Sequence, residues 1–353
     1  MTKLSTKHVK IVGMSACVPQ ESEENISLPL FASEEDARKV ILSTGIERHR
    51  KAAKGTTASD LSIKAVTKLL TDLEWPIEEI DCLFYVCTSR DFIAPQTSCI
   101  LQAKLGLRED CFVMDLPLGC AGWVYGMSVA TAMMQNGTFK RGLLIAAETN
   151  TQNRNQNDRS VRPLFGDAAT VTALEFNQDF THPYNFVFGV DGTGANAIYM
   201  PYGGTRNPTT KESLSEVEIE PGIIRKGTDM IVNGMDVFGF AIKRPALSIK
   251  ELISSFEINL DTIDYLFLHQ ANKYIDEKIR KSLRIPAEKV PYSLHDYGNV
   301  TCASIPLTIV TQCRDNIFRN DNHCIACGFG VGLSWSSMEF HFGPIHMPFI
   351  IEY

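Results

Sequence analysis

The most informative absences are long apolar runs and an excess of positive charge. Apolar stretches such as 143–147 are far too short to span a bilayer, and none follows the lysines near the N-terminus, so we expect no signal peptide, no membrane partner and a cytoplasmic protein. The formal net charge of −7 argues against a nucleic-acid partner. The Gly-rich stretch at 191–194 lacks the Lys-Ser/Thr ending of a phosphate-binding loop.

Dense cysteine spacing is also missing. Ten cysteines are spread along 353 residues, mostly in apolar runs, which is typical of reduced thiols inside a cell rather than of a disulfide scaffold. Cys324 and Cys327 form a CxxC pair, but there is no second pair and both lie in an apolar run that predicts a buried strand. We therefore expect no metal site.

The chain contains a weak internal duplication. Ser-Ile-Lys opens a helical pattern at 62 and again at 248, and Ile-Asp precedes a strand at 80 and again at 263. Cys-Ala begins a helical pattern at 120 and again at 302. The repeated order of strand, helix, strand, helix and strand predicts an α/β protein with parallel strands covered by helices, divided near 177–183 into halves 1–178 and 179–353.

Periodicity gives the expected elements. We predict strands at 9–13, 82–88, 111–116, 142–148, 168–176, 185–191, 263–269, 323–329 and 332–340. We predict helices at 60–73, 95–105, 121–136, 236–256, 273–283 and 303–317. Ligands bind beyond the carboxyl ends of strands in such folds.

Three side chains fall at predicted strand ends or in loops that lead into helices, and they form a candidate catalytic set. Cys120 precedes a predicted helix, where the helix dipole and free amides favour the thiolate. His269 and Asn299 can supply a base and hydrogen-bond donors for acyl transfer. Taken singly, Cys120 fits a buried apolar residue, His269 a satisfied strand-end histidine and Asn299 a turn residue. Their order along the chain favours a thioester-handling site.

The motifs around these residues resemble those of the thiolase-fold condensing enzymes, specifically β-ketoacyl-acyl carrier protein synthase III. The resemblance rests on Gly-Cys-Ala-Gly at 119–122, His-Gln-Ala-Asn at 269–272, the run at 297–306 and the Gly-rich turn at 328–335. The stretches at 44–48 and 165–169 also fit, so it spans about residues 9–342. It implies a thiolase-like fold of two duplicated βαβαβ-type halves in a layered α/β/α/β/α core.

The resemblance also implies an activity. An acyl group from acyl-coenzyme A or acyl-carrier protein is loaded on Cys120 and condensed with malonyl-carrier protein in a decarboxylative Claisen reaction, with no bound cofactor. The amides of Cys120 and Val331 are the implied oxyanion hole, although the family usually has glycine at the second position. His269 and Asn299 are the implied donors to the enolate oxygen. This makes the chain a transferase of fatty acid biosynthesis and lipid metabolism.

Further residues carry substrate and partner expectations from the resemblance. Arg159 and Phe238 match substrate-binding positions, while Lys39 replaces the tryptophan of a coenzyme A adenine clamp, so acetyl-coenzyme A is in doubt as donor. Ala94 lies in a loop that closes the partner's acyl pocket in a homodimer, and its small size predicts an acyl group larger than acetyl. Carrier docking is implied for the lysines of the helix after His269, namely Lys273, Lys278 and Lys281.

Two other functions remain open at this point. The same fold can transfer an acyl group from Cys120 to a hydroxyl or amine without condensation. It can also form an inactive partner subunit, but such a subunit usually loses the nucleophile, whereas Cys120, His269 and Asn299 are all present.

Overall fold

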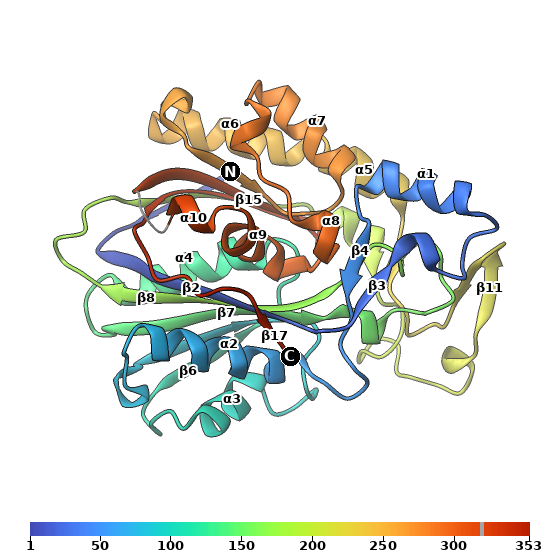
Figure 1. Cartoon of the computed structure of the whole chain (residues 1–353), viewed down its shortest axis with the longest axis horizontal. Coiled ribbons are helices and arrows are strands. Elements are labelled where there is room, and N and C mark those ends of the chain that lie inside the picture. The colour runs from blue at the N-terminus through green and yellow to red at the C-terminus, as the bar shows by residue number, and fades with distance from the viewer. Residues whose placement is uncertain (318–320) are drawn as a thin grey trace.

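The protein is built of five layers. The structure is a computed structural model that describes residues 1–317 and 321–353. In Figure 1, helices α6 and α7 cover one sheet, α4 and α9 lie between that sheet and a second one, and α2 and α3 cover the far face of the second sheet. This is the α/β/α/β/α arrangement predicted for a thiolase-like fold.

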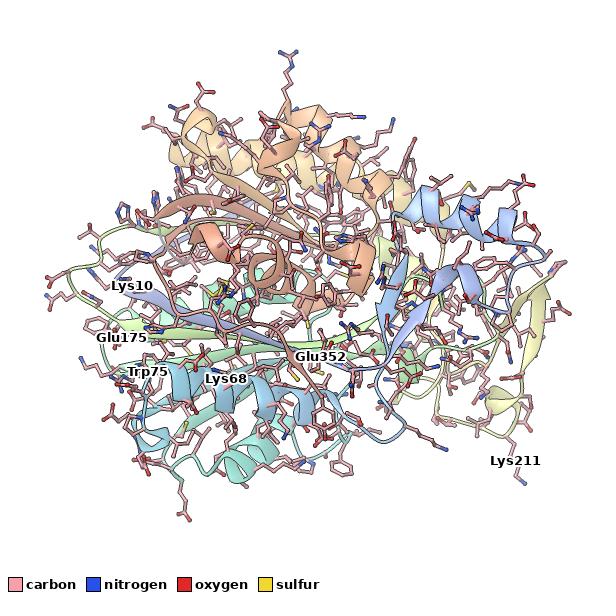
Figure 2. All side chains as sticks on the ribbon, viewed as in Figure 1. Lys10, Lys68, Trp75, Glu175, Lys211 and Glu352 are labelled. Carbon is pink, nitrogen blue, oxygen red and sulfur yellow. The ribbon has the colours of Figure 1, made fainter. Side chains whose placement is uncertain are left out.

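The first sheet has six strands in the order β17-β2-β8-β7-β5-β6. Their bounds are Ile351–Glu352 (β17), Val9–Val18 (β2), Asp167–Phe176 (β8), Arg141–Thr149 (β7), Cys82–Val86 (β5) and Phe112–Leu116 (β6). Lys10 stands opposite Glu175 in the β2–β8 register, and both labels lie at the same end of the sheet in Figure 2.

The second sheet has five strands in the order β1-β9-β16-β15-β14. Their bounds are Thr2–Thr6 (β1), Tyr184–Val190 (β9), Ser334–Phe342 (β16), Asn322–Gly330 (β15) and Tyr265–Leu268 (β14). The two ends of the chain are exchanged between the sheets, because β1 pairs with β9 and β17 pairs with β2.

The strand directions agree only in part with the parallel sheet predicted from the alternation of strands and helices. The pairs β5–β7, β5–β6 and β14–β15 are parallel, as predicted for strands joined through helices. The last long strand of each half, β8 or β16, follows its predecessor without an intervening α-helix and is antiparallel to it. Both sheets are therefore mixed, not purely parallel. The division at residue 178 stays a prediction.

The predicted helices are found with two corrections, and the helices at Glu34–Thr44 and Leu294–Tyr297 were not predicted. The observed helices are α1 (Glu34–Thr44), α2 (Ala58–Asp72), α3 (Thr97–Leu105), α4 (Gly122–Met134), α5 (Gly234–Ala241), α6 (Arg244–Phe256), α7 (Lys273–Leu283), α8 (Leu294–Tyr297), α9 (Ser304–Gln312) and α10 (Arg314–Ile317). The single helix predicted at 236–256 is wrong, because Pro245 starts a new helix after a break at Lys243. The helix predicted at 303–317 is likewise divided, at Cys313.

Local signals and burial fix these elements. The side chain of Thr57 accepts from the Asp60 amide while Asp60 accepts from the Thr57 amide, which caps the start of α2. Trp123 of α4 is fully buried between the sheets and donates to Thr172 Oγ1 at 3.2 Å. Replacing so large a buried side chain by alanine costs about 3–5 kcal/mol.

Short strands form a lobe that the sequence did not predict. It holds the pairs β10 (Ile198–Tyr199) with β13 (Ile231–Val232) and β11 (Val217–Glu220) with β12 (Ile223–Arg225), and Lys211 marks its outer end in Figure 2. A further pair, β3 (Ser22–Glu24) with β4 (Arg48–Arg50), lies beside α1. No helix within 1–317 or 321–353 has both the length and the apolar character needed to cross a membrane.

Candidate active site

One cavity of about 360 Å³ brings the predicted catalytic set together. Cys120, His269 and Asn299 all line it, together with Val331. Cys120 comes from the loop after β6, His269 from the end of β14, and Asn299 from the turn before α9. Apolar side chains form much of the wall, among them Met200, Met230, Val232, Phe240, Ile275 and Phe329.

Glycines position the nucleophile. A Cβ built on Gly122, the first residue of α4, would lie 2.5 Å from Val86 Cγ1, and one on Gly330 would lie 2.5 Å from Cys120 Sγ. The Gly-rich turn therefore packs directly against the sulfur, and only a residue without a side chain fits there.

Burial dominates the electrostatics of Cys120. Desolvation raises the pKa of its thiol to about 11, although the backbone N–H groups of Val331 and of Cys120 itself act in the opposite direction. The expectation that the helix start favours the thiolate is wrong for this state of the protein. The resting Cys120 sulfur is a thiol, so any nucleophilic attack by it requires a base.

His269 is placed as a neutral base. Its ring is buried, and burial lowers its pKa to about 3. Its Nδ1 lies 2.8 Å from Ser304 Oγ, whose hydroxyl also lies 2.8 Å from the Thr301 carbonyl. With Nδ1 engaged, Nε2 is the ring nitrogen available to the cavity. An unprotonated Nε2 can accept the thiol proton.

Asn299 is held in one orientation. Its side-chain Oδ1 accepts from the backbone N–H of Thr301 at 2.9 Å, and its backbone N–H donates to the Leu164 carbonyl at 2.7 Å. The preceding Gly298 has φ = 65°, where a Cβ would meet the Leu164 carbonyl at 2.9 Å. Because Oδ1 is occupied, the N–H groups of Nδ2 are the donors left for a ligand.

The predicted substrate residues lie outside the cavity lining. Arg159 is exposed, and its side chain packs against Gly222. Phe238 stacks on Tyr274 with ring centroids 5.8 Å apart, whereas Val237 and Phe240 of the same helix line the cavity. The neighbouring turn positions of α5, rather than Phe238, face the site. Ala94 is exposed in its loop, and its placement in a partner's pocket stays a prediction.

The three predicted docking lysines share the exposed face of α7. Lys273, Lys278 and Lys281 are all exposed. Lys278 lies over the Tyr274 ring at 5.2 Å, and Lys281 Nζ is 3.8 Å from Glu277 Oε2. A carrier contact remains a prediction for this face.

Sequence reasoning missed several cavity or supporting residues. Asn150 and Arg154 line the cavity, and Ser304 holds His269. Buried Glu148 accepts from the backbone and hydroxyl of both Thr88 and Ser89 at 2.7–3.0 Å. Ser304 lies inside the run at 297–306 that carries the family resemblance. The polar stretch around Arg154 has no periodic apolar pattern that would predict its burial.

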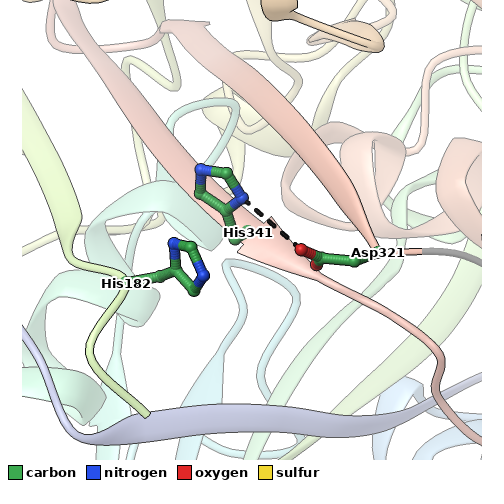
Figure 3. A group of neighbouring side chains, drawn as sticks. All are labelled: His182, Asp321 and His341. Atoms are coloured by element: carbon green, nitrogen blue, oxygen red, sulfur yellow. Dashed lines mark ion pairs between the residues drawn. The ribbon is translucent and has the colours of Figure 1, made fainter.

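A separate cluster of metal-ligating residue types lies at the other end of the second sheet. His182, Asp321 and His341 form it (Figure 3), and His341 Nδ1 is 3.9 Å from Asp321 Oδ2. The His182 and His341 rings stack at 4.2 Å and 24°, so their in-plane lone pairs run side by side rather than toward one ion. Strand β15 runs from Asn322, the residue after Asp321, to Gly330 beside Cys120, so its length separates the two sites by about 26 Å.

The comparisons with known proteins agree on one family. Family models of the 3-oxoacyl-[acyl-carrier-protein (ACP)] synthase III domain and of its C-terminal domain match residues 114–192 and 253–342. Beta-ketoacyl-[acyl-carrier-protein] synthase III of Caldanaerobacter subterraneus is 30% identical over 93% of this chain and 96% of its own length.

Solved structures support the same assignment. The crystal structure of 3-oxoacyl-(acyl-carrier protein) synthase from Burkholderia xenovorans LB400 superposes with a TM-score of 0.92 at 32% identity, covering 100% of this chain and 99% of that one. The priming β-ketosynthase of the R1128 polyketide pathway shares the fold, with a TM-score of 0.83 at 22% identity, covering 96% and 97%. The chain belongs to the 3-oxoacyl-[acyl-carrier-protein] synthase III family.

Proposed function

We propose that this protein is a condensing acyltransferase that stores an acyl group on Cys120 and joins it to a malonyl unit. The observation that carries the proposal is the convergence of Cys120, His269 and Asn299 on one cavity, with the Val331 amide directed at the sulfur. The family and its relatives, which are named as synthases acting with acyl carrier protein, support the same reaction.

The first half-reaction loads the enzyme. Nε2 of His269 takes the thiol proton as the Cys120 sulfur attacks the thioester carbonyl, and the proton then passes to the departing thiol. The N–H groups of Cys120 and Val331 stabilise the oxyanion, and each such donor is worth about 2.7–4 kcal/mol. The buried imidazole is neutral at physiological pH, so Nε2 has a free lone pair for the proton. Its lowered pKa also makes it a weak base, so the proton has to pass on to the departing thiolate.

The second half-reaction forms the carbon–carbon bond. Malonyl-carrier protein loses carbon dioxide, and the charge that develops on its thioester oxygen is stabilised by N–H donors of Asn299 and His269. The Ser304 hydroxyl donates to the Thr301 carbonyl in this structure, so donation from Nε2 requires that hydroxyl to turn toward Nδ1. The carbanion attacks the acyl carbon, the Cys120 thiolate leaves and takes up a proton, and a 3-oxoacyl carrier protein results.

Simple acyl transfer to a hydroxyl or amine is the less favoured function. It requires the nucleophile, the base and the oxyanion donors, but gives no role to a second donor for an enolate. The fixed carboxamide of Asn299 therefore favours condensation over the simpler transfer.

The partner proposals follow from two surfaces. We infer a homodimer from β6, a half-buried strand at the edge of the first sheet, where a second copy can continue the sheet. We infer docking of the acidic carrier protein on the face of Lys273, Lys278 and Lys281. The acyl donor is acyl-coenzyme A or acyl-carrier protein, and a cytoplasmic place in fatty acid biosynthesis fits these substrates.

Carbon dioxide release tests the proposal. Purified protein is given an acyl donor and malonyl-carrier protein, and carbon dioxide and the 3-oxoacyl product are measured for the native chain and for Cys120→Ala. We expect equal amounts of both products with the native chain and neither 3-oxoacyl product nor acyl adduct with the variant. Acylation of Cys120 without carbon dioxide release, with transfer to an added alcohol or amine, would contradict condensation.

A further inference from the structure

A buried guanidinium lies in the wall of the catalytic cavity. Arg154 is only 7% exposed and lines the same cavity as Cys120. It follows the short helix η3 (Asn150–Asn153), whose first residue Asn150 also lines the cavity and is 2% exposed. An arginine buried to this degree normally has a paired anion.

Arg154 lacks such a partner. Its Nη2 donates to Asn150 Oδ1 at 2.9 Å, its Nη1 donates to the Asn153 carbonyl at 3.3 Å, and its Cζ lies 4.7 Å from the centre of the Phe165 ring. Its Nε has no hydrogen-bond partner, and no carboxylate forms an ion pair with it anywhere in residues 1–317 or 321–353.

Neighbouring carboxylates do not supply the missing ion-pair partner of Arg154. Glu148, Asp167 and Asp229 attract Arg154 at longer range. Both oxygens of Glu148 already accept from Thr88 and Ser89, both oxygens of Asp167 accept hydrogen bonds from other residues, and Asp229 Oδ2 accepts from Asn155 and Lys226. By contrast, two nearby arginines are each paired with a carboxylate. Arg162 donates to Glu23 at 2.7 Å and 3.1 Å, and Arg225 donates to Asp158 at 2.6 Å. The side of Arg154 away from the site meets a hollow of only about 10 Å³.

Burial distinguishes the closed end of the cavity from its mouth. Met200 and Tyr199 line the cavity and are 47% and 36% exposed, so they mark the open side through which a carrier arm can enter. Asn150 and Arg154 are buried, so they mark the closed side. The two arms of a thioester leave its carbonyl carbon in different directions, and only the acyl group is small enough for the closed side.

We propose that Arg154, with Asn150 beside it, binds a carboxylate at the far end of the acyl group, so that the preferred acyl donor is a dicarboxylic acyl thioester. Nε, which is unpartnered but shut off from the cavity here, lies on the same edge of the guanidinium as Nη2, so a small rotation of the side chain would present both N–H groups to the two oxygens of a carboxylate. This inference rests on the proposed function, because it concerns the acyl group loaded on Cys120.

A connected chain of hydrogen bonds holds this end of the cavity in register with the catalytic residues. Asn150 Nδ2 lies 3.3 Å from Thr301 Oγ1, and the Thr301 amide donates to Asn299. Asp167 accepts from the amide of Thr151, which fixes the segment that carries both Asn150 and Arg154. The subsite is therefore built from supported side chains rather than from a surface loop.

The test compares acyl donors of matched length. Succinyl-, glutaryl- and adipyl-coenzyme A are set against neutral acyl-coenzyme A donors of equal chain length, and the rate of Cys120 acylation is followed by intact-protein mass spectrometry. In the native chain we expect the best dicarboxylic donor to react about 10- to 100-fold faster than its neutral counterpart. Arg154→Met should remove that preference, and Arg154→Lys should retain part of it.

The controls separate this inference from the proposed function. Arg206→Met removes an exposed arginine and should leave the preference unchanged. Loading of neutral acyl groups with no advantage for dicarboxylic ones would overturn the inference while leaving the proposed function intact. An equal loss of both donor classes in Arg154→Met, in a protein that still melts cooperatively, would show a purely structural role. Failure of every donor to load Cys120 would overturn both proposals.

Discussion

The pH dependence of Cys120 reactivity follows directly from its burial. With a thiol pKa of about 11, the thiolate fraction at pH 7 is about 10⁻⁴, and ionising the sulfur there costs about 5 kcal/mol. His269, with a pKa of about 3, carries no charge that would stabilise the thiolate at neutral pH. The logarithm of the alkylation rate should therefore rise by one for each pH unit from 6 to about 10, without a plateau.

Iodoacetamide labelling measures this profile. The adduct is located by peptide mass spectrometry, because Cys99 is exposed and reacts as well. Cys120→Ala provides the background, and circular dichroism confirms folding at each pH. His269→Ala should leave the alkylation profile unchanged and slow thioester acylation by about 10²- to 10⁴-fold, because in the acylation step the imidazole acts only as proton acceptor. A plateau below pH 8 would mean that the resting site already holds a thiolate–imidazolium pair, and the reasoning would be refuted.

Three further predictions concern single residues. Asn299→Ala should slow decarboxylation of malonyl-carrier protein by about 10²- to 10³-fold while Cys120 still acylates, since only the enolate donor is lost; equal losses in both steps would contradict this. Gly330→Ala should slow acylation by about 100-fold or more because its Cβ meets the sulfur, whereas Gly204→Ala, with open space around it, should not. Burial raises the pKa of Asp167 to about 6, so the folded state holds a proton that the unfolded chain has lost between pH 4 and 6. From pH 4 to pH 6 the free energy of unfolding should fall by up to about 2.7 kcal/mol more in the native chain than in Asp167→Asn. Urea unfolding measures it at both pH values, and an equal change in the native chain and the variant would refute this.

Much of the fold follows from patterns that act locally. The helix predicted at 273–283 has the observed bounds of α7, where Asn272 caps the start and an apolar stripe faces the second sheet. The failure at 236–256 has a local cause too, because Pro245 interrupts a stretch whose apolar spacing is otherwise continuous. The exchange of β1 and β17 between the sheets left no such signal, since it depends on pairing across nearly the whole chain.

In the site, too, the local features could be predicted from the sequence, and the features that depend on the whole fold could not. Placing Cys120 and His269 at strand ends and Asn299 in a loop that leads into a helix was enough to predict that they meet, because ligands in such folds bind beyond the carboxyl ends of the strands. The sign of the thiol pKa shift was predicted wrongly, because the dipole of α4 is a local feature whereas burial depends on the whole fold. Arg154 was missed for a related reason, as its burial comes from packing against Phe165 and Asn150 and not from any property of its own segment.

The most direct measurement is a two-step mass analysis of the peptide that contains Cys120. After incubation with an acyl donor, the acyl mass should appear on Cys120, and addition of malonyl-carrier protein should remove it while a 3-oxoacyl carrier protein forms. An acyl group that stays on the peptide, or one that is found on another residue, would contradict the assignment of Cys120 as the nucleophile of a condensing enzyme.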